Sequence, residues 1–145
     1  ASIVQRRLDR PFGIENLSSY VEFEQSTLTE WEFYSRVVKE SGAWYLLDVN
    51  NVYVSSQNHG FDPASYLDAV DFSRVLQVHL AGFSSEPDGT LVDTHDHPVK
   101  DAVHSLYRSA WQRGGPFPTL LEWDARIPPM PVLLAELEKV RQVRA

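Results

Sequence analysis

Acidic or imidazole side chains stand at or near the ends of four successive apolar stretches: Glu15, Asp48, His79 and Glu122. Carboxylate oxygens are the preferred ligands of hard divalent cations, and imidazole suits iron, zinc and manganese. One acid at a strand end is more often a helix cap or a salt-bridge partner, and one histidine is more often an ordinary core residue. Four in succession favour a metal site, because near-buried acids are rare unless they are paired or bound to metal.

A second candidate pair is Asp93 and His95, which are separated by one residue. On an extended segment such residues face the same way, which suits two ligands of one ion. A solvated acidic loop is the alternative. Asp96 would face the other way, and both Asp96 and His97 are expected to contact outer polar partners or solvent. Asn51, three residues after Asp48, could add a carbonyl oxygen, and hydrogen bonding within a loop explains it equally well.

Four further residues are candidates for substrate binding. Asn58 and His59 either bind substrate or shape their loop. Trp123 directly follows Glu122 and could line the site. Arg126 could hold an anion, although a surface salt bridge is the more common role for such a residue. No catalytic residue is assigned, because no nucleophile and base stand at a recognisable spacing.

The elements that must position these side chains alternate between strands and helices. Proline, glycine and capping residues bound them. We expect strands at residues 12–17, 44–53, 74–82 and 118–124, helices at 2–9, 29–41, 63–70, 98–112 and 130–143, and long loops at 54–61 and 83–96.

This order predicts an α/β fold with a parallel sheet, because the strands alternate with helices and no hairpin signal is apparent. The stretch at 44–53 begins as an apolar run, as in a strand covered on both faces. The carboxyl ends of parallel strands meet at one end of the sheet, where ligands collect. The candidate ligands should therefore converge.

The composition narrows the function. The 145 residues are 43% hydrophobic and carry a formal net charge of −7, which fits one globular core and a poor binder of nucleic acid. Cysteine is absent, which excludes disulfides, thiolate metal sites and a cysteine nucleophile within this chain. No secretory or membrane-length apolar run is visible, so we expect a cytoplasmic protein without a membrane partner.

Six segments together resemble the DUF692 family, also called UPF0276, a group of multinuclear non-heme iron-dependent oxidative enzymes that includes the iron enzyme of methanobactin biosynthesis. The segments are ENLSSY at 15–20, LLDVNNVYVS at 46–55, NHGFDP at 58–63, VHLAG at 78–82, DTHD at 93–96 and LEWD at 121–124. The resemblance covers nearly the whole chain, and the segment around Asp48 is the most specific.

The resemblance implies a xylose-isomerase-like TIM barrel. Such a barrel needs about 250 residues and eight strands, whereas about four βα units are expected here. Residues 1–145 are therefore expected to form a single domain that is the C-terminal half of the barrel, or a truncated barrel. The family's N-terminal half, which carries two further histidine ligands, would be supplied separately, or the chain would self-associate through exposed sheet edges.

The resemblance also implies a ligand set for two or three iron ions. Glu15 would bridge two metals, and Asp48, His79 and Glu122 would complete one of those sites. Asn51, Asp93 and His95 would hold a third ion. Asn51 stands where the zinc AP endonucleases of the wider superfamily have a histidine, which weakens an endonuclease interpretation.

By resemblance, the complete protein would oxidatively modify cysteine residues of a ribosomally made peptide, using O2 and a mixed-valent iron pair. A separate partner protein would present the leader peptide, and this fragment alone would be inactive. Two alternatives stay open. One is a zinc- or magnesium-dependent hydrolase or isomerase on the same barrel, and the other is a non-catalytic truncated domain.

Overall fold

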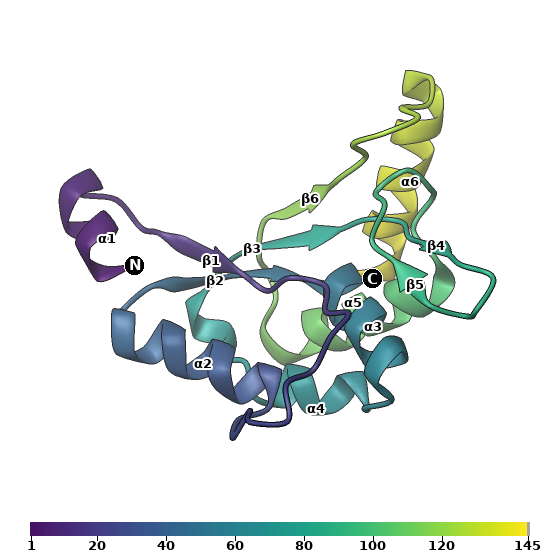
Figure 1. Cartoon of the computed structure of the whole chain (residues 1–145). Coiled ribbons are helices and arrows are strands. Elements are labelled where there is room, and N and C mark those ends of the chain that lie inside the picture. Colours follow the sequence, from purple (N-terminus) through teal and green to yellow (C-terminus); the bar gives the residue numbers. More distant parts are fainter. Residues whose placement is uncertain (145) are drawn as a thin grey trace.

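A four-stranded parallel sheet organises the computed structural model, which describes residues 1–144 (Figure 1). Its strands are β1 (Gly13–Glu15), β2 (Trp44–Asp48), β3 (Val75–Leu80) and β6 (Thr119–Leu121), and they lie side by side in the order β1-β2-β3-β6. Each strand pairs in parallel with the next one along the chain, which confirms the predicted α/β architecture. Within residues 1–144 the sheet stays open, with β1 and β6 at its edges, as in a partial barrel.

Helices cover one face of this sheet (Figure 1). Below it in the view lie α2 (Glu30–Ser41), α3 (Val49–His59), α4 (Pro63–Asp68) and α5 (Asp101–Gly114). The short η1 (Phe72–Arg74) leads into β3, α1 (Ser2–Leu8) precedes β1, and α6 (Met130–Val143) packs against α5. No helix in the described part of the chain is long and apolar enough to cross a membrane.

The hydrophobic core lies between the sheet and these helices. Leu47 of β2 and Val78 and Leu80 of β3 are fully buried there, together with Val52 and Val54 of α3. Side chains alternate between the two faces of a strand. The residues next to these core positions therefore face away from the helices, and the candidate ligands are among them.

Two sequence-based expectations about the segment 44–61 are wrong. The second strand ends at Asp48, and residues 49–59 form α3, including most of the stretch expected to be a loop. The Asp48 side chain caps this helix by accepting a hydrogen bond from the Asn51 backbone N–H at 2.7 Å. Val52 and Val54 are fully buried. Burial of α3 on most of its sides thus outweighs the weak helix propensity of these β-branched residues.

The expectation of an irregular loop at 83–96 is also incomplete, because the segment contains a short antiparallel hairpin. Its strands are β4 (Ser84–Ser85) and β5 (Leu91–Val92). Asp88 and Gly89 lie in the turn between them, and Gly89 adopts a φ of 92°, a conformation that favours glycine. The hairpin stands near the carboxyl ends of the parallel strands (Figure 1).

Candidate metal centre

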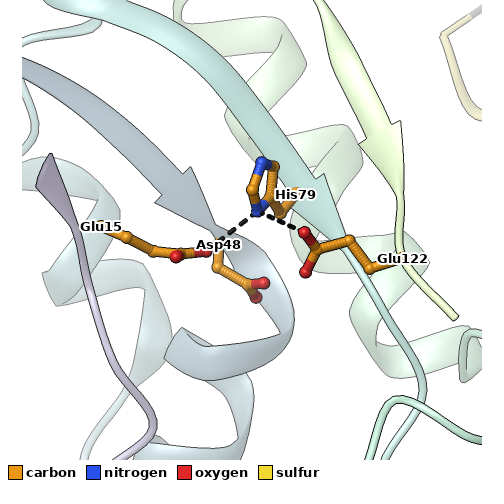
Figure 2. Close-up of side chains that lie close together, drawn as sticks. All are labelled: Glu15, Asp48, His79 and Glu122. Carbon is orange, nitrogen blue, oxygen red and sulfur yellow. Dashed lines mark hydrogen bonds and ion pairs between the residues drawn. The ribbon is translucent and has the colours of Figure 1, made fainter. Parts of the chain in front are cut away.

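The four residues predicted from the strand ends meet in space (Figure 2). Glu15 ends β1, Asp48 ends β2, His79 lies in β3 and Glu122 follows β6. Asp48 and His79 are register partners on neighbouring strands. One ligand atom from each of the four lies within 4.8 Å of those of the others, a spacing that could hold one metal ion.

His79 stands between two carboxylates in this cluster. Its Nδ1 lies 2.9 Å from Glu15 Oε1 and 3.1 Å from Glu122 Oε1, and its side chain is only 8% exposed. One ring nitrogen carries at most one proton and cannot bond fully to two carboxylates. The arrangement therefore concentrates negative charge around a nearly buried imidazole, which a cation would balance.

Asp48 gives the most direct indication of a cation site. The residue is fully buried, and its Oδ1 accepts the Asn51 N–H that caps α3. Its Oδ2 is buried and has no hydrogen-bond partner within residues 1–144. Burial raises the pKa of this carboxyl from 3.8 to about 7. The donors present therefore fit a divalent cation, which would satisfy the free oxygen.

Asn16, which the sequence analysis did not assign to the site, fixes the position of Asp48. Its side-chain amide donates to the Asp48 carbonyl and accepts from the Asp48 N–H, both at 2.9 Å. The Asn16 carbonyl in turn accepts from Asn51 Nδ2 at 3.0 Å. Asn16 is itself buried. Through its side chain and its backbone carbonyl, Asn16 therefore holds both the strand end and the first turn of α3.

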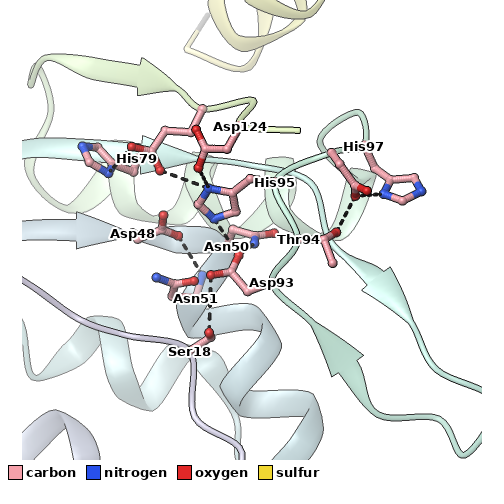
Figure 3. Close-up of polar contacts among 12 residues, drawn as sticks. Ser18, Asp48, Asn50, Asn51, His79, Asp93, Thr94, His95, His97 and Asp124 are labelled. Atoms are coloured by element: carbon pink, nitrogen blue, oxygen red, sulfur yellow. Dashed lines mark hydrogen bonds and ion pairs between the residues drawn. The ribbon is translucent and has the colours of Figure 1, made fainter. Parts of the chain in front are cut away.

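A second group of potential ligands lies beside the first and consists of His95, Glu122 and Asp124. Figure 3 shows His95 and Asp124 of this group next to each other. His95 Nδ1 lies 3.0 Å from Asp124 Oδ2 and 3.4 Å from Glu122 Oε2. Its Nε2 lies 2.7 Å from Asp93 Oδ1, and this approach of Asp93 raises the pKa of His95 to about 9. Glu122 therefore faces His79 with one oxygen and His95 with the other, and so links the two groups.

Asp93 and His95 meet as predicted, although by a different geometry. His95 has a φ of 49°, so the segment turns there and is not extended. Asp93 is held by Asn50, whose Nδ2 donates to its Oδ1 at 2.6 Å, and by the Ser18 hydroxyl at 3.3 Å. Asn51 donates through its amide nitrogen, and its buried Oδ1 has no partner among residues 1–144, so this oxygen remains available to a cation.

Asp96 and Arg126 secure the turn that carries His95. The Asp96 carboxylate accepts from Thr94 Oγ1 and Arg126 and contacts His97. The Thr94 hydrogen bond and then the Arg126 guanidinium lower the pKa of Asp96 to about 2. Arg126, a candidate for substrate binding, thus forms a salt bridge, the alternative considered for it. The Asp124 N–H donates to the His95 carbonyl across the same junction at 2.8 Å.

Asn58 and His59, two of the other candidate substrate residues, form their hydrogen bonds outside both groups of ligands. Asn58 exchanges two hydrogen bonds with the Leu91 backbone, at 2.9 and 3.0 Å, and fastens β5 to the end of α3. His59 Nε2 lies 3.0 Å from the Ser19 hydroxyl. Trp123, half-buried between Glu122 and Asp124, has a buried Nε1 without a partner in the described part of the chain.

Four polar residues of the site were missed: Asn16, Ser18, Asn50 and Asp124. The sequence pattern could have indicated Asp124 as a site residue, because it lies two residues after Glu122 in the segment that leaves β6. No sequence pattern could have indicated Asn50 and Ser18, because their contacts with Asp93 depend on the α3 helix and on a long-range loop contact.

Comparison with known proteins adds an independent line of evidence. A family model described as "RiPP precursor modification enzyme MbnB/TglH/ChrH" matches residues 1–145. A UPF0276 protein of Acaryochloris marina is 50% identical over 95% of this chain, and one of Caulobacter vibrioides is 48% identical over 97% of it. One of Anaeromyxobacter is 46% identical over 98% of it. In each case the match covers 50% of the relative, so the chain spans about half the length of these curated relatives.

The match over all 145 residues agrees with the resemblance found in the sequence motifs. The chain therefore belongs to the MbnB/TglH/ChrH family of RiPP precursor modification enzymes, to which the name UPF0276 also applies.

Proposed function

We propose that this chain is the C-terminal half of an iron-dependent oxidative enzyme that modifies cysteine residues of a ribosomally made precursor peptide. The family supports a peptide-modifying activity. The observation that carries the metal assignment is the buried, unpartnered Asp48 Oδ2 inside a group of three carboxylates and one imidazole. Such an atom is costly in an apolar interior unless a cation or a donor faces it.

The ligand set divides into two neighbouring positions. Glu15, Asp48, His79 and Glu122 would hold one ion. A further ion would lie near His95, with ligands drawn from Glu122, Asp124, Asp93 and the Asn51 carbonyl. The mixture of carboxylate oxygen and imidazole nitrogen suits iron, and also zinc. When bound, the iron supplies the redox chemistry.

The side chains of this chain prepare the site for such ions. Asn16 holds the Asp48 backbone, so the free carboxylate oxygen keeps its place at the strand end. Asp93 stabilises the protonated form of His95 at neutral pH when no cation is present. That proton must leave before His95 can act as a ligand, so ion binding releases protons.

The complete activity would need the other half of the protein. The relatives are about twice as long as this chain, and β1 and β6 are open edges within residues 1–144. We propose that a complementary half-barrel joins these edges and contributes further ligands, and that a separate protein presents the leader of the peptide. This chain alone would then bind metal without full turnover.

Metal binding by the chain tests the proposal directly. The purified chain is reconstituted with Fe(II) without oxygen, desalted and measured by elemental analysis. We expect at least one equivalent of iron, and an affinity loss of at least about 100-fold in Asp48→Asn, because this change removes a ligand and not merely its supporting partner. The matched control is Asp68→Asn, at a carboxylate that is 67% exposed and pairs with Arg113. Full iron occupancy in Asp48→Asn would exclude the site.

A zinc- or magnesium-dependent hydrolase or isomerase is the second candidate. The observation in its favour is the predominance of oxygen donors, which these cations also accept. Competition between Fe(II), Zn(II) and Mg(II) during reconstitution separates the candidates, since tightest retention of iron supports the oxidative enzyme. A folded chain that retains none of the three would instead support a non-catalytic domain.

A further inference from the structure

An open cleft lies beside the candidate metal centre. The segment from β1 to α2, residues 16–29, runs from the strand end past α3 to the start of α2 (Figure 1). Together with the first turn of α2 and the end of α3, it encloses about 980 Å³. This volume is at the upper end of the range of about 300–1,000 Å³ that is usual for ligand sites. The cleft is thus large enough for more than a small ion or metabolite.

The walls of the cleft present apolar side chains to solvent. Val21, Phe23 and Phe33 are 72%, 70% and 60% exposed, and Trp31 and Phe61 pack against each other at 4.9 Å between ring centroids. A contiguous exposed apolar surface of this kind usually marks a binding site. The surface favours an occupant that brings apolar side chains of its own.

The charges around the cleft have one sign. Its charged lining residues are Glu22, Glu30 and Glu32, and neither lysine nor arginine lines it. Glu22 is 76% exposed at its side chain, and its Oε1 lies 3.8 Å from His59 Nδ1 at the edge of the cleft. Three carboxylates around an apolar surface complement a cationic partner and disfavour both an anionic membrane and a second copy of the same surface.

Two adjacent serines connect the cleft to the metal centre. The Ser18 hydroxyl donates to the candidate ligand Asp93. The Ser19 hydroxyl forms a hydrogen bond with His59, and Ser19 and His59 both line the cleft. An extended peptide advances about 3.3 Å per residue, so a chain seated in the cleft can reach the centre within a few residues.

We propose that this cleft binds an extended peptide segment that combines apolar side chains with lysine or arginine, and so holds the precursor peptide beside the metal centre. The inference rests on the proposed function, because it takes the substrate to be a peptide. It assigns the cleft to recognition and the strand ends to chemistry.

Binding of a model peptide tests this assignment. The probe is a blocked ten-residue peptide that alternates leucine or phenylalanine with lysine and has no cysteine. It is titrated into the metal-free chain in the presence of a chelator, and binding is followed by backbone amide chemical shifts. We expect saturable shifts at Val21, Phe23 and Phe33, and at least tenfold weaker binding when glutamate replaces each lysine. Equal affinity for the two peptides, or no binding, would overturn the proposal.

Two substitutions, at side chains with similar exposed fractions, test whether the peptide binds at the cleft. Phe33→Ser should weaken binding at least tenfold. Leu134→Ser, on α6 and 57% exposed, should leave it unchanged. If the free chain self-associates and Phe33→Ser abolishes this self-association, the surface would instead be assigned to binding a second copy of the chain. The probe has no cysteine, and the titration is made without metal, so this test is independent of iron binding. If the peptide does not bind, the iron proposal still stands. If the chain binds no iron, the peptide test remains valid.

Discussion

Leu47 and Asp48 are neighbours on β2 and are equally inaccessible to solvent, yet their side chains lie in opposite environments. Leu47 faces the helices and packs in the hydrophobic core. Asp48 faces the other side of the sheet, where one of its oxygens has no partner within residues 1–144. Alternation along one strand thus places a stabilising residue beside a destabilising one.

The two faces of the sheet separate the hydrophobic core from the proposed metal site. On the helix face, burial of apolar surface holds the sheet together. At the strand ends, acids and imidazoles are collected at a cost in stability that a bound cation would offset. Ligands that bind the folded state alone stabilise it, so the polar face should respond to metal and the apolar face should not.

The largest effect is expected on the helix face. Leu47→Ala removes a fully buried side chain and should lower the free energy of unfolding by about 2–5 kcal/mol. Urea denaturation followed by circular dichroism measures the change. The iron content per folded molecule should be preserved, and a drop in it with little change in stability would contradict the division.

Replacement of Asp48 by asparagine is expected to raise the stability of the metal-free protein in a pH-dependent way. The folded state keeps this carboxyl protonated up to about pH 7, whereas the unfolded chain ionises it near 3.8, so the stability of the metal-free protein falls as pH rises across that window. Asp48→Asn should therefore be more stable than the parent by on the order of a few kcal/mol above pH 7, and the gap should close towards pH 4.

Thermal unfolding without metal, measured from pH 4 to pH 8, checks this prediction. With excess Fe(II) the order should reverse, because the parent binds the ion far more tightly than the variant does. A gap that does not change with pH would show that Asp48 ionises normally in the folded chain.

A smaller effect, on iron affinity, is expected from replacing Asn16, which bonds to the Asp48 backbone but is not a ligand in the proposal. Asn16→Ala should weaken iron binding by about 10- to 100-fold, as is typical when a residue that orients a ligand is lost. Isothermal titration under anaerobic conditions measures the affinity. Asn58→Ala serves as the control, because it removes an amide that bonds to the Leu91 backbone, outside the ligand groups.

The smallest effect is expected at Asp124. Its side chain is 72% exposed, so solvent already screens its contact with His95. Asp124→Asn should weaken binding of the second ion less than tenfold and leave the first unaffected. Stepwise titration separates the two ions, and complete loss of both would give Asp124 a larger role than its exposure suggests.

The parallel sheet and the convergence of the four strand-end residues could be predicted, because they depend on patterns within single strands. Glu15, Asp48, His79 and Glu122 each stand at or near the end of an apolar run, and parallel strands carry such ends to one place. The helical conformation of 49–59 could not be predicted, since valine and asparagine are weak helix formers and only burial between sheet and helices makes them helical. The contacts of Asn50 and Ser18 with Asp93 join segments far apart in the sequence, so no local pattern shows them.

Glu122 has a consequence for how the two positions fill. One of its oxygens faces His79 and the other faces His95, so a cation bound on either side would fix the orientation of the shared carboxylate for the other side. Carboxylate orientation favours a second ion, while charge repulsion between ions opposes it, and the balance is a coupling free energy that is the same in whichever order the sites fill. The centre should therefore load cooperatively or anticooperatively, and not as two independent sites.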